Sequence, residues 1–341
     1  MYKPKVVIFE KGVKEYELGK HLYQIFLKKE GVEVFDEVPS NRIKSYIDGE
    51  SADIFYRNGK LTLVVSAKKP GTFQTCKPSA DYMLPLVSGC MGQCEYCYLH
   101  TQLGDKPYVR VNVNIDDILA KASKYIEDNK GEVTTFEGSA TSDPLCVEPY
   151  TGALKKTIEF FSKEPNGGFR FVSKYSDVEN LLDIQHNNKT EVRFSLNTER
   201  IRGEYEHFTA NIPSRIEAAA KMMKAGYPVG FLIAPVFVYE GWEEEYISLL
   251  EDLKAKLPEN RQHPLFFEVI SHRYTPRAKN LINEIFPTST LPMQEDERTY
   301  RHGQFGYGKY VYPKEKMQLI KELFQNKLPE YFPGCEIKYI I

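Results

Sequence analysis

The sequence has few cysteines, no long apolar stretch and almost no net charge, and each of these shortages excludes a class of protein. Six cysteines in 341 residues, with no apolar signal segment at the N-terminus, favour a reducing cytoplasm over a disulfide-bonded secreted protein. No run of about 18 apolar residues is present, so we expect no membrane-spanning helix. The formal net charge of −2 means that any polyanion must bind a local patch rather than the chain as a whole.

The order of the expected elements predicts an α/β fold. Residues 1–78 are typical of a small α/β segment, and the proline-containing turns at 68–71 and 77–78 mark a boundary before residues 79–341. In this larger part, short apolar runs alternate with helical stretches: we expect strands at 83–87, 133–136, 169–172, 192–196, 230–236 and 265–270, and helices at 115–129, 150–162, 177–185, 213–225 and 243–257. Six such units predict a partial parallel (β/α)6 barrel of the TIM-like kind, with its active site at the C-terminal ends of the strands. A hairpin and a helix follow at the C-terminus.

Three of the six cysteines lie close together, in the segment Cys90-Met-Gly-Gln-Cys94-Glu-Tyr-Cys97. Thiolates at this spacing can each bind one iron of a 4Fe–4S cluster and leave the fourth iron open to a small molecule. The alternative is a structural zinc site completed by His100, but four ligands so close in the chain give a poor tetrahedral arrangement. The spacing therefore favours a cluster with one open iron.

Polar residues follow the expected strands at the points where a parallel barrel places its active site. They are the cysteine loop, Glu137 to Asp143, Ser173 and Lys174, Ser195 and Asn197, the segment at Ala234, and Ser271 to Tyr274. Lys174 is a candidate for neutralising a carboxylate, and Ser195 and Asn197, on alternate strand positions, for contacting hydroxyl groups or the same carboxylate. Each of these residues is also compatible with an ordinary polar loop or barrel lining.

The cysteine motif and the β/α repeat after it resemble the radical S-adenosylmethionine superfamily. The segments Met83 to Tyr98, Thr141-Ser-Asp143 and Gly303 to Tyr310 resemble, within it, the spore photoproduct lyase family, and the resemblance covers nearly the whole chain. It implies a 4Fe–4S cluster and S-adenosyl-L-methionine as cofactors. It also implies that the cofactor is bordered by Tyr96, Gly138, Ser139, Lys174, Ser195, Asn197 and Ala234, although the chain lacks a literal Gly-Gly-Glu after the second strand.

The resemblance further implies a carbon–carbon lyase that repairs the spore photoproduct, 5-thyminyl-5,6-dihydrothymine, in DNA. A 5′-deoxyadenosyl radical would remove the C6 hydrogen, the methylene bridge would break, and a cysteine would quench the thymine radical, with Tyr96 and Tyr98 relaying hydrogen back to the cofactor. In the family that cysteine directly precedes the Thr-Ser-Asp motif, where this chain has Ala140. A methyl group cannot donate this hydrogen, so we expect impaired final donation. We interpret Ala140 as an engineered change, with natural divergence as the alternative.

Other cysteines offer no clear replacement for the missing donor. Cys146 lies six residues downstream of Ala140, and its position gives no reason to place it at the site, so we expect it to be structural or inert. Cys76 and Cys335 are further away still in the sequence. The sequence therefore predicts a chain that begins the reaction but does not complete it correctly.

The C-terminal segment 301–316 interleaves basic and aromatic residues, and Gly306 and Gly308 suit a tight hairpin. The side chains that we expect to contact the lesion or its phosphates are Ser142, Asp143, His272, Arg273, Arg301, Phe305, Tyr307 and Lys309. An extruded base that stacks on an aromatic ring gains about 1–3 kcal/mol. The alternative is an ordinary hairpin that closes the barrel.

The implied partners are DNA that contains the photoproduct and an external electron donor of the flavodoxin or ferredoxin type, with no membrane. We expect a monomer or weak dimer in the cytoplasm of the bacterial spore core. Two other classes stay open: a radical enzyme acting on a different substrate, and a non-catalytic binder of DNA lesions with a structural metal site. Extra cysteines for further clusters would favour the first class, and a colourless protein would favour the second.

Overall fold

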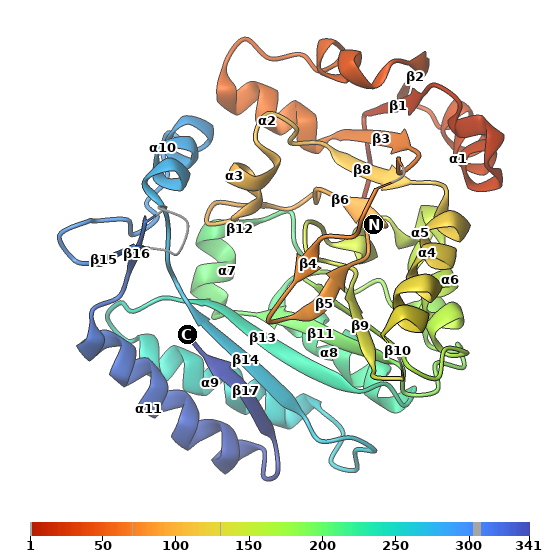
Figure 1. The fold of residues 1–341 in the computed structure, drawn as a ribbon. Helices are drawn as coiled ribbons and strands as arrows, with labels where there is room; N and C mark the ends of the chain where they lie inside the picture. The colour runs from red at the N-terminus through yellow and green to blue at the C-terminus, as the bar shows by residue number, and fades with distance from the viewer. Residues whose placement is uncertain (1, 70, 130, 303–307) are drawn as a thin grey trace. The chain divides into compact units, whose positions relative to one another are not determined.

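The computed structural model describes residues 2–69, 71–129, 131–302 and 308–341 (Figure 1), and it divides into two compact units. Unit 1 comprises residues 1–92, 102–173 and 177–191, and unit 2 comprises residues 93–101, 174–176 and 192–341. The cysteine loop therefore begins in unit 1 and ends in unit 2.

The N-terminal part of unit 1 forms a mostly parallel sheet with the strand order β2-β1-β3-β8-β6. Its strands are β1 (Val6–Glu10), β2 (Glu33–Val38), β3 (Thr62–Ser66), β6 (Val87–Ser88) and β8 (Val109–Asn112); α1 (Glu17–Leu27) and α2 (Ala52–Lys60) connect the first three. Every residue of β3 is buried, as a central strand covered on both faces requires. The α/β segment expected over residues 1–78 thus shares its sheet with two strands from later in the chain.

A second sheet of unit 1 carries the first strands of the expected barrel. Strands β5 (Ala80–Met83), β9 (Thr134–Glu137) and β10 (Gly167–Ser173) pair in parallel in chain order, and β4 (Thr75–Cys76) adds an antiparallel edge. Helix α4 (Ile115–Asp128) precedes β9, and α5 (Glu148–Thr151) and α6 (Ala153–Phe161) precede β10. Stacked aromatic rings pack α6 against β10, with the Phe161 and Phe169 centroids 5.5 Å apart.

Unit 2 continues the same pattern. Strands β11 (Thr190–Leu196), β13 (Val229–Val236), β14 (Phe266–Ser271) and β17 (Glu336–Ile340) pair in parallel in chain order through residues 192–340. The helices between them in the chain are α7 (Glu199–Tyr205), α8 (Ile212–Lys224), α9 (Trp242–Lys256), α10 (Pro276–Ile285) and α11 (Lys314–Tyr331). Helices α9 and α11 lie side by side against this sheet (Figure 1). Parallel strands separated by helices are the arrangement that a (β/α) barrel requires.

Local sequence signals fix the helix that matters most for the site. Helix α8 begins after Asn211, whose side chain accepts a hydrogen bond from the N–H of Ser214 at 2.8 Å and so caps the first turn. Ile216 and Met222 lie on its buried face. Gly226, with φ of +90°, follows the helix and prevents it from continuing. The expected helix at 213–225 is therefore confirmed.

Two expectations about the elements were wrong in detail. Residues 177–185 form only a short 3-10 turn, Glu179–Leu181, because apolar residues at a spacing of three satisfy such a turn as well as a helix. The expected strand at 83–87 is divided between the end of β5 and the start of β6. The C-terminal hairpin is confirmed by the antiparallel pair β15 (Thr299–His302) and β16 (Gly308–Val311). Among the residues that the structure describes, no helix is both long enough and apolar enough to cross a membrane.

Candidate active site

The cysteine loop is held by backbone contacts within each unit. Cys94 lies in the two-residue strand β7 (Gln93–Cys94), opposite Glu206 of β12 (Glu206–His207). The N–H of Cys97 donates to the carbonyl of Cys94 at 3.1 Å, which closes a turn. In unit 1, the N–H of Gly92 donates to the Sγ atom of Cys90 at 3.3 Å. Hydrogen bonds to cysteine sulfur are among the contacts that tune iron–sulfur clusters.

The donor set at this loop fits an iron–sulfur cluster better than a zinc ion. Each iron of a cubane takes one thiolate, whereas structural zinc draws four ligands around one ion. His100, the fourth ligand of the zinc alternative, is buried, and its Nε2 atom lies 2.9 Å from the carbonyl oxygen of Cys94. The loop thus offers separate thiolates, as a cluster requires.

Two buried side chains that the sequence did not single out lie beside Cys90 in unit 1. Lys60, the last residue of α2, is 3% exposed, and its ammonium group donates to the carbonyl of Cys90 at 2.8 Å. Burial raises the pKa of the Cys146 thiol well above its ordinary value, and a hydrogen bond to Cys90 raises it further. Cys146 was expected to be structural or inert, but the structure places it beside the first cysteine of the motif.

The loop after β9 is fixed by contacts within unit 1. The carboxylate of Glu137 accepts hydrogen bonds from the hydroxyl of Ser139 and from its N–H, the latter at 3.1 Å. A side chain at Gly138 would meet the ring of Phe169 at 2.7 Å, so this position requires glycine. Ala140 follows directly and is partly buried. Ser139 and Gly138 therefore hold the loop in place, and their contact with the cofactor stays a prediction.

The Thr-Ser-Asp motif connects two strand ends of unit 1. Ser142 and Asp143 are buried, and the hydroxyl of Ser142 donates to the carbonyl of Gly138 at 3.3 Å. The hydroxyl of Ser173, at the end of β10, lies 2.8 and 3.0 Å from the two carboxylate oxygens of Asp143. The motif thus fixes the loop after β9 to the end of β10, and its contact with a thymine edge stays a prediction.

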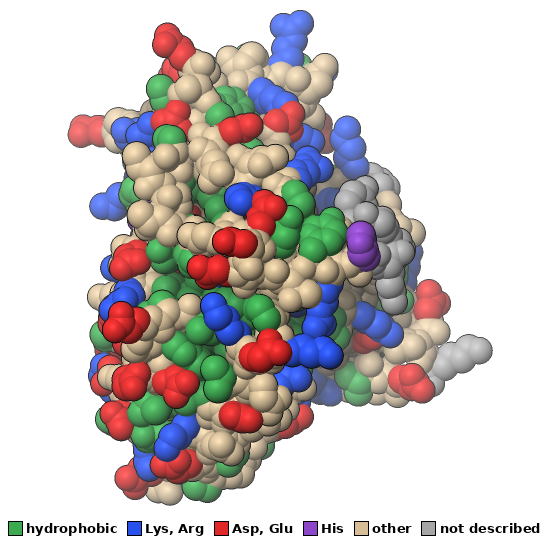
Figure 2. Space-filling model, turned by 90° about the vertical axis from the view of Figure 1, so that its left-hand side faces the viewer, with side chains coloured by type: hydrophobic (Ala, Val, Ile, Leu, Met, Phe, Trp, Pro, Cys, Tyr) green, Lys and Arg blue, Asp and Glu red, His purple; other side chains and the backbone are tan. Residues whose placement is uncertain are grey.

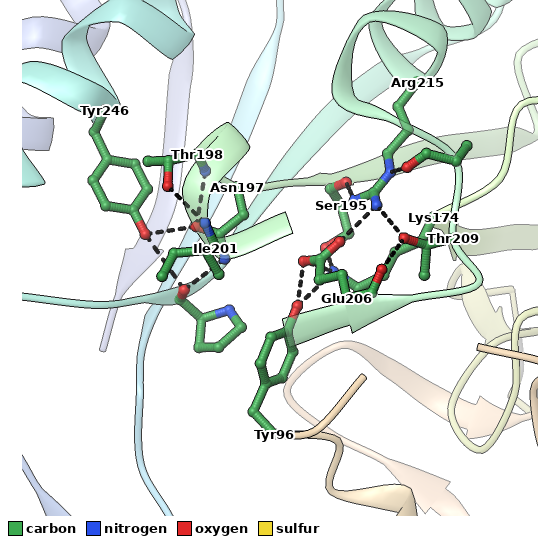
Figure 3. A network of polar contacts seen from close by, with 12 residues as sticks. Tyr96, Lys174, Ser195, Asn197, Thr198, Ile201, Glu206, Thr209, Arg215 and Tyr246 are labelled. Atoms are coloured by element: carbon green, nitrogen blue, oxygen red, sulfur yellow. Dashed lines mark hydrogen bonds and ion pairs between the residues drawn. The ribbon is translucent and has the colours of Figure 1, made fainter. Parts of the chain in front are cut away.

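Lys174 is the centre of a polar network in unit 2 (Figure 3). Its ammonium group lies 2.7 Å from the carboxylate of Glu206, 3.0 Å from the hydroxyl of Ser195 and 3.1 Å from that of Tyr96. The Tyr96 hydroxyl donates to the same carboxylate oxygen. Arg215 on α8 is fully buried and donates to the other oxygen of Glu206 at 2.6 Å. The structure therefore brings together three of the residues predicted to border the cofactor.

Sequence reasoning missed Glu206 and Arg215, the two residues that hold this network in place. Burial opposes the ionisation of Glu206, but the charges of Lys174 and Arg215 outweigh it and lower the pKa of the carboxyl to about 2. Burial, reinforced by the charge of Glu206, raises the pKa of Tyr96 well above its ordinary value, so the phenol stays protonated. The network therefore contains one carboxylate between two cations. An arginine among the apolar residues of α8 is a weak sequence signal for it.

Asn197 belongs to a neighbouring cluster in the same unit. Its amide nitrogen donates to the carbonyl of Pro235 at 2.8 Å, and its oxygen accepts from the hydroxyl of Tyr246 at 2.7 Å (Figure 3). Asn197 is fully buried, and Ala234 directly precedes the proline that it contacts. The observed contacts show Asn197 fixing the end of β13. Its contact with a ribose, and that of the Ala234 backbone with an adenine, stay predictions.

Three of the cations predicted to contact DNA interact electrostatically in unit 2. Arg301 of β15 lies directly opposite Lys309 of β16. Partial burial lowers the pKa of Lys309, and the charges of Arg273 and Arg301 lower it further. Like charges on opposite strand positions repel, so a bound anion would stabilise the cluster. His272 differs from the expectation, because it is 2% exposed and stacks on Phe237 with ring centroids 4.4 Å apart.

The remaining predicted residues are exposed or lie outside the described residues. Tyr98 is 59% exposed. Phe305 and Tyr307 fall in the segment that the structure does not describe. Figure 2 shows basic and acidic side chains interspersed on the face drawn, which agrees with the net charge of −2 and leaves local clusters as the means of holding a polyanion.

Known proteins match the chain along its whole length. The family model described as spore photoproduct lyase matches residues 2–341. Curated spore photoproduct lyases from Clostridium acetobutylicum and Bacillus subtilis are 50% and 41% identical to it over 336 residues, which are 98% of this chain and 98% of each relative.

Solved structures of spore photoproduct lyase have the same fold. One is a complex with the dinucleoside spore photoproduct; another is a variant with alanine in place of the cysteine at position 140 and cysteine in place of the serine at position 76, with bound AdoMet and dinucleoside spore photoproduct. Both have TM-scores of 0.95, sequence identities of 41% and 42%, and coverage of 100% of this chain and 99% of theirs. The expected partial barrel of the radical S-adenosylmethionine type is thereby confirmed. The chain belongs to the spore photoproduct lyase family and is an enzyme of the radical S-adenosylmethionine lyase class.

Proposed function

We propose that this enzyme repairs DNA by splitting the spore photoproduct, 5-thyminyl-5,6-dihydrothymine, into two thymines. Cys90, Cys94 and Cys97 would hold a 4Fe–4S cluster, which when bound supplies the electron that breaks a sulfur–carbon bond of S-adenosylmethionine. The observation that carries the proposal is the gathering of cofactor-contact candidates around Glu206, directly opposite Cys94 in the β7–β12 pair. The solved relative with AdoMet and the dinucleoside photoproduct supports it.

Lys174 is the residue that binds the carboxylate of S-adenosylmethionine. Its ammonium group is held by Glu206 and Ser195, so its charge is directed before the cofactor arrives. The contact with the Tyr96 hydroxyl is the longest of the three, at 3.1 Å, and a carboxylate can replace it with a stronger, charge-assisted bond. Arg215 keeps Glu206 ionised, so this network has two positive charges and one negative charge. Its net positive charge favours an anionic ligand.

The last hydrogen donation is the step in which this chain departs from the family pattern, because Ala140 has no thiol. The chain has a cysteine at position 76 and an alanine at 140, the same pair as the solved double variant. In unit 1, Ser79 connects Cys76 to the end of β9: the N–H of Ser79 donates to the carbonyl of Cys76 at 3.0 Å, and the hydroxyl of Ser79 donates to Glu137 at 2.8 Å. We therefore propose Cys76 as the thiol that quenches the thymine radical, in place of the failed donation expected from Ala140 alone.

Anaerobic turnover of dinucleoside photoproduct tests both parts of this proposal. We expect the parent to cleave S-adenosylmethionine and form thymidine, and Cys76→Ser to retain cleavage but lose most repair and form adducts. Adding Ala140→Cys to Cys76→Ser should restore thymidine, and Cys335→Ser, which removes a thiol of unit 2, should behave as the parent. If the parent repairs nothing until Ala140→Cys is made, Cys76 is not the donor and the chain is impaired. A parent that takes up no iron and cleaves no S-adenosylmethionine contradicts the function itself.

The cation cluster of Arg273, Arg301 and Lys309 contacts phosphates beside the lesion. Each lost phosphate contact lowers the slope of log affinity against log salt concentration by about one. The double variant Arg301→Gln with Lys309→Gln should therefore lower the slope by about two, whereas Lys221→Gln on α8 should leave it unchanged. Fluorescence anisotropy with a lesion-containing duplex at several salt concentrations measures this, and an unchanged slope in the double variant would rule out the contact.

The same proposal includes the finer roles that the family pattern implies. Tyr96 and Tyr98 relay hydrogen between donor and cofactor, and Ser142 and Asp143 contact the lesion. An external electron donor of the flavodoxin or ferredoxin type reduces the cluster, in a monomer or weak dimer within the cytoplasm of the spore core.

A further inference from the structure

Lys60 is a buried cation for which the described residues supply no anion. Among the described residues, its ammonium group has one hydrogen bond and one cation–π contact. It donates to the carbonyl of Cys90 at 2.8 Å and lies 5.2 Å from the ring centroid of Tyr56. No described carboxylate forms an ion pair with it, although the residue is only 3% exposed. Buried ammonium groups are nearly always paired, because removing the charge from water is costly. The burial of the charged Lys60 side chain therefore requires an explanation other than packing.

The position of Lys60 at the C-terminus of α2 does not supply that explanation. Cations in a last turn are stabilised by the carbonyl groups at the end of their own helix. The ammonium group of Lys60 donates instead to Cys90, the first cysteine of the motif. The backbone is fixed separately, since the hydroxyl of Tyr2 donates to the carbonyl of Lys60 at 3.1 Å and that of Tyr150 donates to the carbonyl of Tyr2 at 2.7 Å. Both the place of Lys60 and the direction of its side chain are thus specified.

We propose that Lys60 is a positioning residue that holds a positive charge at Cys90 and thereby raises the reduction potential of the cluster. The inference rests on the proposed function, in which Cys90 is a cluster ligand. The cysteine ligands are negatively charged, and reduction adds one electron from the external donor. A fixed cation nearby stabilises the more negative, reduced form more than the oxidised form. Burial increases this effect, because a buried charge is poorly screened by water and salt.

The test compares reduction potentials of reconstituted enzymes in the absence of substrate. Parent, Lys60→Met, Lys60→Gln, Lys60→Arg and Lys29→Met are loaded anaerobically with iron and sulfide, and the reduced cluster is followed by EPR in a redox titration. Lys29 is a control in unit 1, because its ammonium group also lies over aromatic rings but donates to the hydroxyl of Tyr150, at 2.6 Å, rather than to the cysteine loop. Lys60→Gln keeps an N–H donor for Cys90 and removes only the charge.

We expect Lys60→Met and Lys60→Gln to lower the equilibrium constant for reduction by about tenfold, which is a negative shift of about 59 mV for one electron. Lys60→Arg and Lys29→Met should stay close to the parent. Unchanged potentials in Lys60→Gln, or an equal shift in Lys29→Met, would overturn the inference. If Lys60→Met fails to fold, Lys60→Gln carries the same expectation. Failure of the parent to take up iron counts against the proposed function. If the parent takes up iron but the Lys60 substitutions leave the reduction potential unchanged, only the role of Lys60 is contradicted.

Discussion

The cations of the two units differ in the partners that surround them. In unit 2, Lys174 and Arg215 share the carboxylate of Glu206, at 2.7 and 2.6 Å, and all three groups are fixed by further hydrogen bonds. In unit 1, the residues that the structure describes give the ammonium group of Lys60 only a carbonyl oxygen and an aromatic face. The first arrangement is compensated within the protein and sets the geometry of its side chains. The second leaves a positive charge without an anion in the described part of unit 1.

The difference matters because burying a charge costs free energy. A buried charge loses the solvation of water, and a partner at close range returns part of that loss. Glu206 stays ionised in the interior because two cations outweigh the effect of burial on its pKa. Removing one charged member of such a set leaves the other charges without their partner, whereas removing Lys60 takes a hydrogen bond from the carbonyl of Cys90 but leaves no charge without a partner among the described residues.

The largest effect is expected from Glu206→Gln. The substitution leaves the buried Arg215 and the partly buried Lys174 without their counter-charge, and breaking a buried pair such as Arg215–Glu206 typically lowers the free energy of unfolding by about 3–5 kcal/mol. Urea unfolding monitored by circular dichroism measures it. Glu217→Gln, which removes an exposed carboxylate 3.6 Å from Lys221, is the matched control and should change little. A small effect of Glu206→Gln would show that the network is not compensated as the structure indicates.

A second prediction concerns acid. The pKa of Glu206 is lowered from 4.5 to about 2 in the folded protein, so its stabilising contribution is present above about pH 4.5 and is lost as the pH falls towards 2. The full contribution is about 3 kcal/mol, from about 1.4 kcal/mol for each unit of pKa shift. The stability difference between parent and Glu206→Gln should therefore shrink over this range. A difference that stays constant down to pH 3 would contradict the low pKa.

Ser195→Ala should have a smaller effect. The hydroxyl is one of three acceptors around the ammonium group of Lys174, at 3.0 Å, and Glu206 remains in place without it. We expect a loss of about 1 kcal/mol in the free energy of unfolding, together with weaker binding of S-adenosylmethionine in calorimetry, because Lys174 is less well directed. An unchanged affinity would show that Ser195 does not position Lys174 for the cofactor.

The smallest effect is expected from Lys60→Met in the cofactor-free chain. Because the described residues provide no anion for Lys60, its removal should leave the free energy of unfolding within about 1 kcal/mol of the parent or raise it. The same urea experiment as for Glu206→Gln applies. A loss as large as that of Glu206→Gln would mean that Lys60 is compensated within the chain, and the contrast between the two units would fail.

Much of the architecture could be predicted from the sequence, because its signals are local. Alternating apolar runs and helical stretches placed β9, β10, β11, β13 and β14, and the Asn211 cap and Gly226 bounded α8. The failure at residues 177–185 is also local in origin, since apolar residues three apart do not distinguish a 3-10 turn from a helix. Strand β8 was missed because its pairing partner is the distant β3.

The candidate site was predictable only in part. Tyr96, Lys174 and Ser195 were expected because each stands at a motif or strand end, and the structure joins them. Glu206, Arg215 and Lys60 were not expected, since none of them has a motif of its own. Lys60 and Glu206 contact Cys90 and Lys174, which lie 30 and 32 residues away in the chain, and Arg215 contacts Glu206, which has no motif either. His272 was expected to contact the lesion or a phosphate, and the structure shows it buried and stacked on Phe237.

The sequence alone determined three cysteines at a fixed spacing, an alanine at position 140 and a β/α repeat around them. These are covalent facts or local periodicities, and they need no knowledge of long-range contacts. Only the tertiary structure decided how charge is distributed around these residues. Lys174 lies beside the carboxylate of Glu206, whereas Lys60 lies beside a backbone carbonyl of the cysteine loop. Which of these partners a lysine meets depends on which segments pack together, because electrostatic interactions in a protein interior depend on distance and burial rather than on order in the chain.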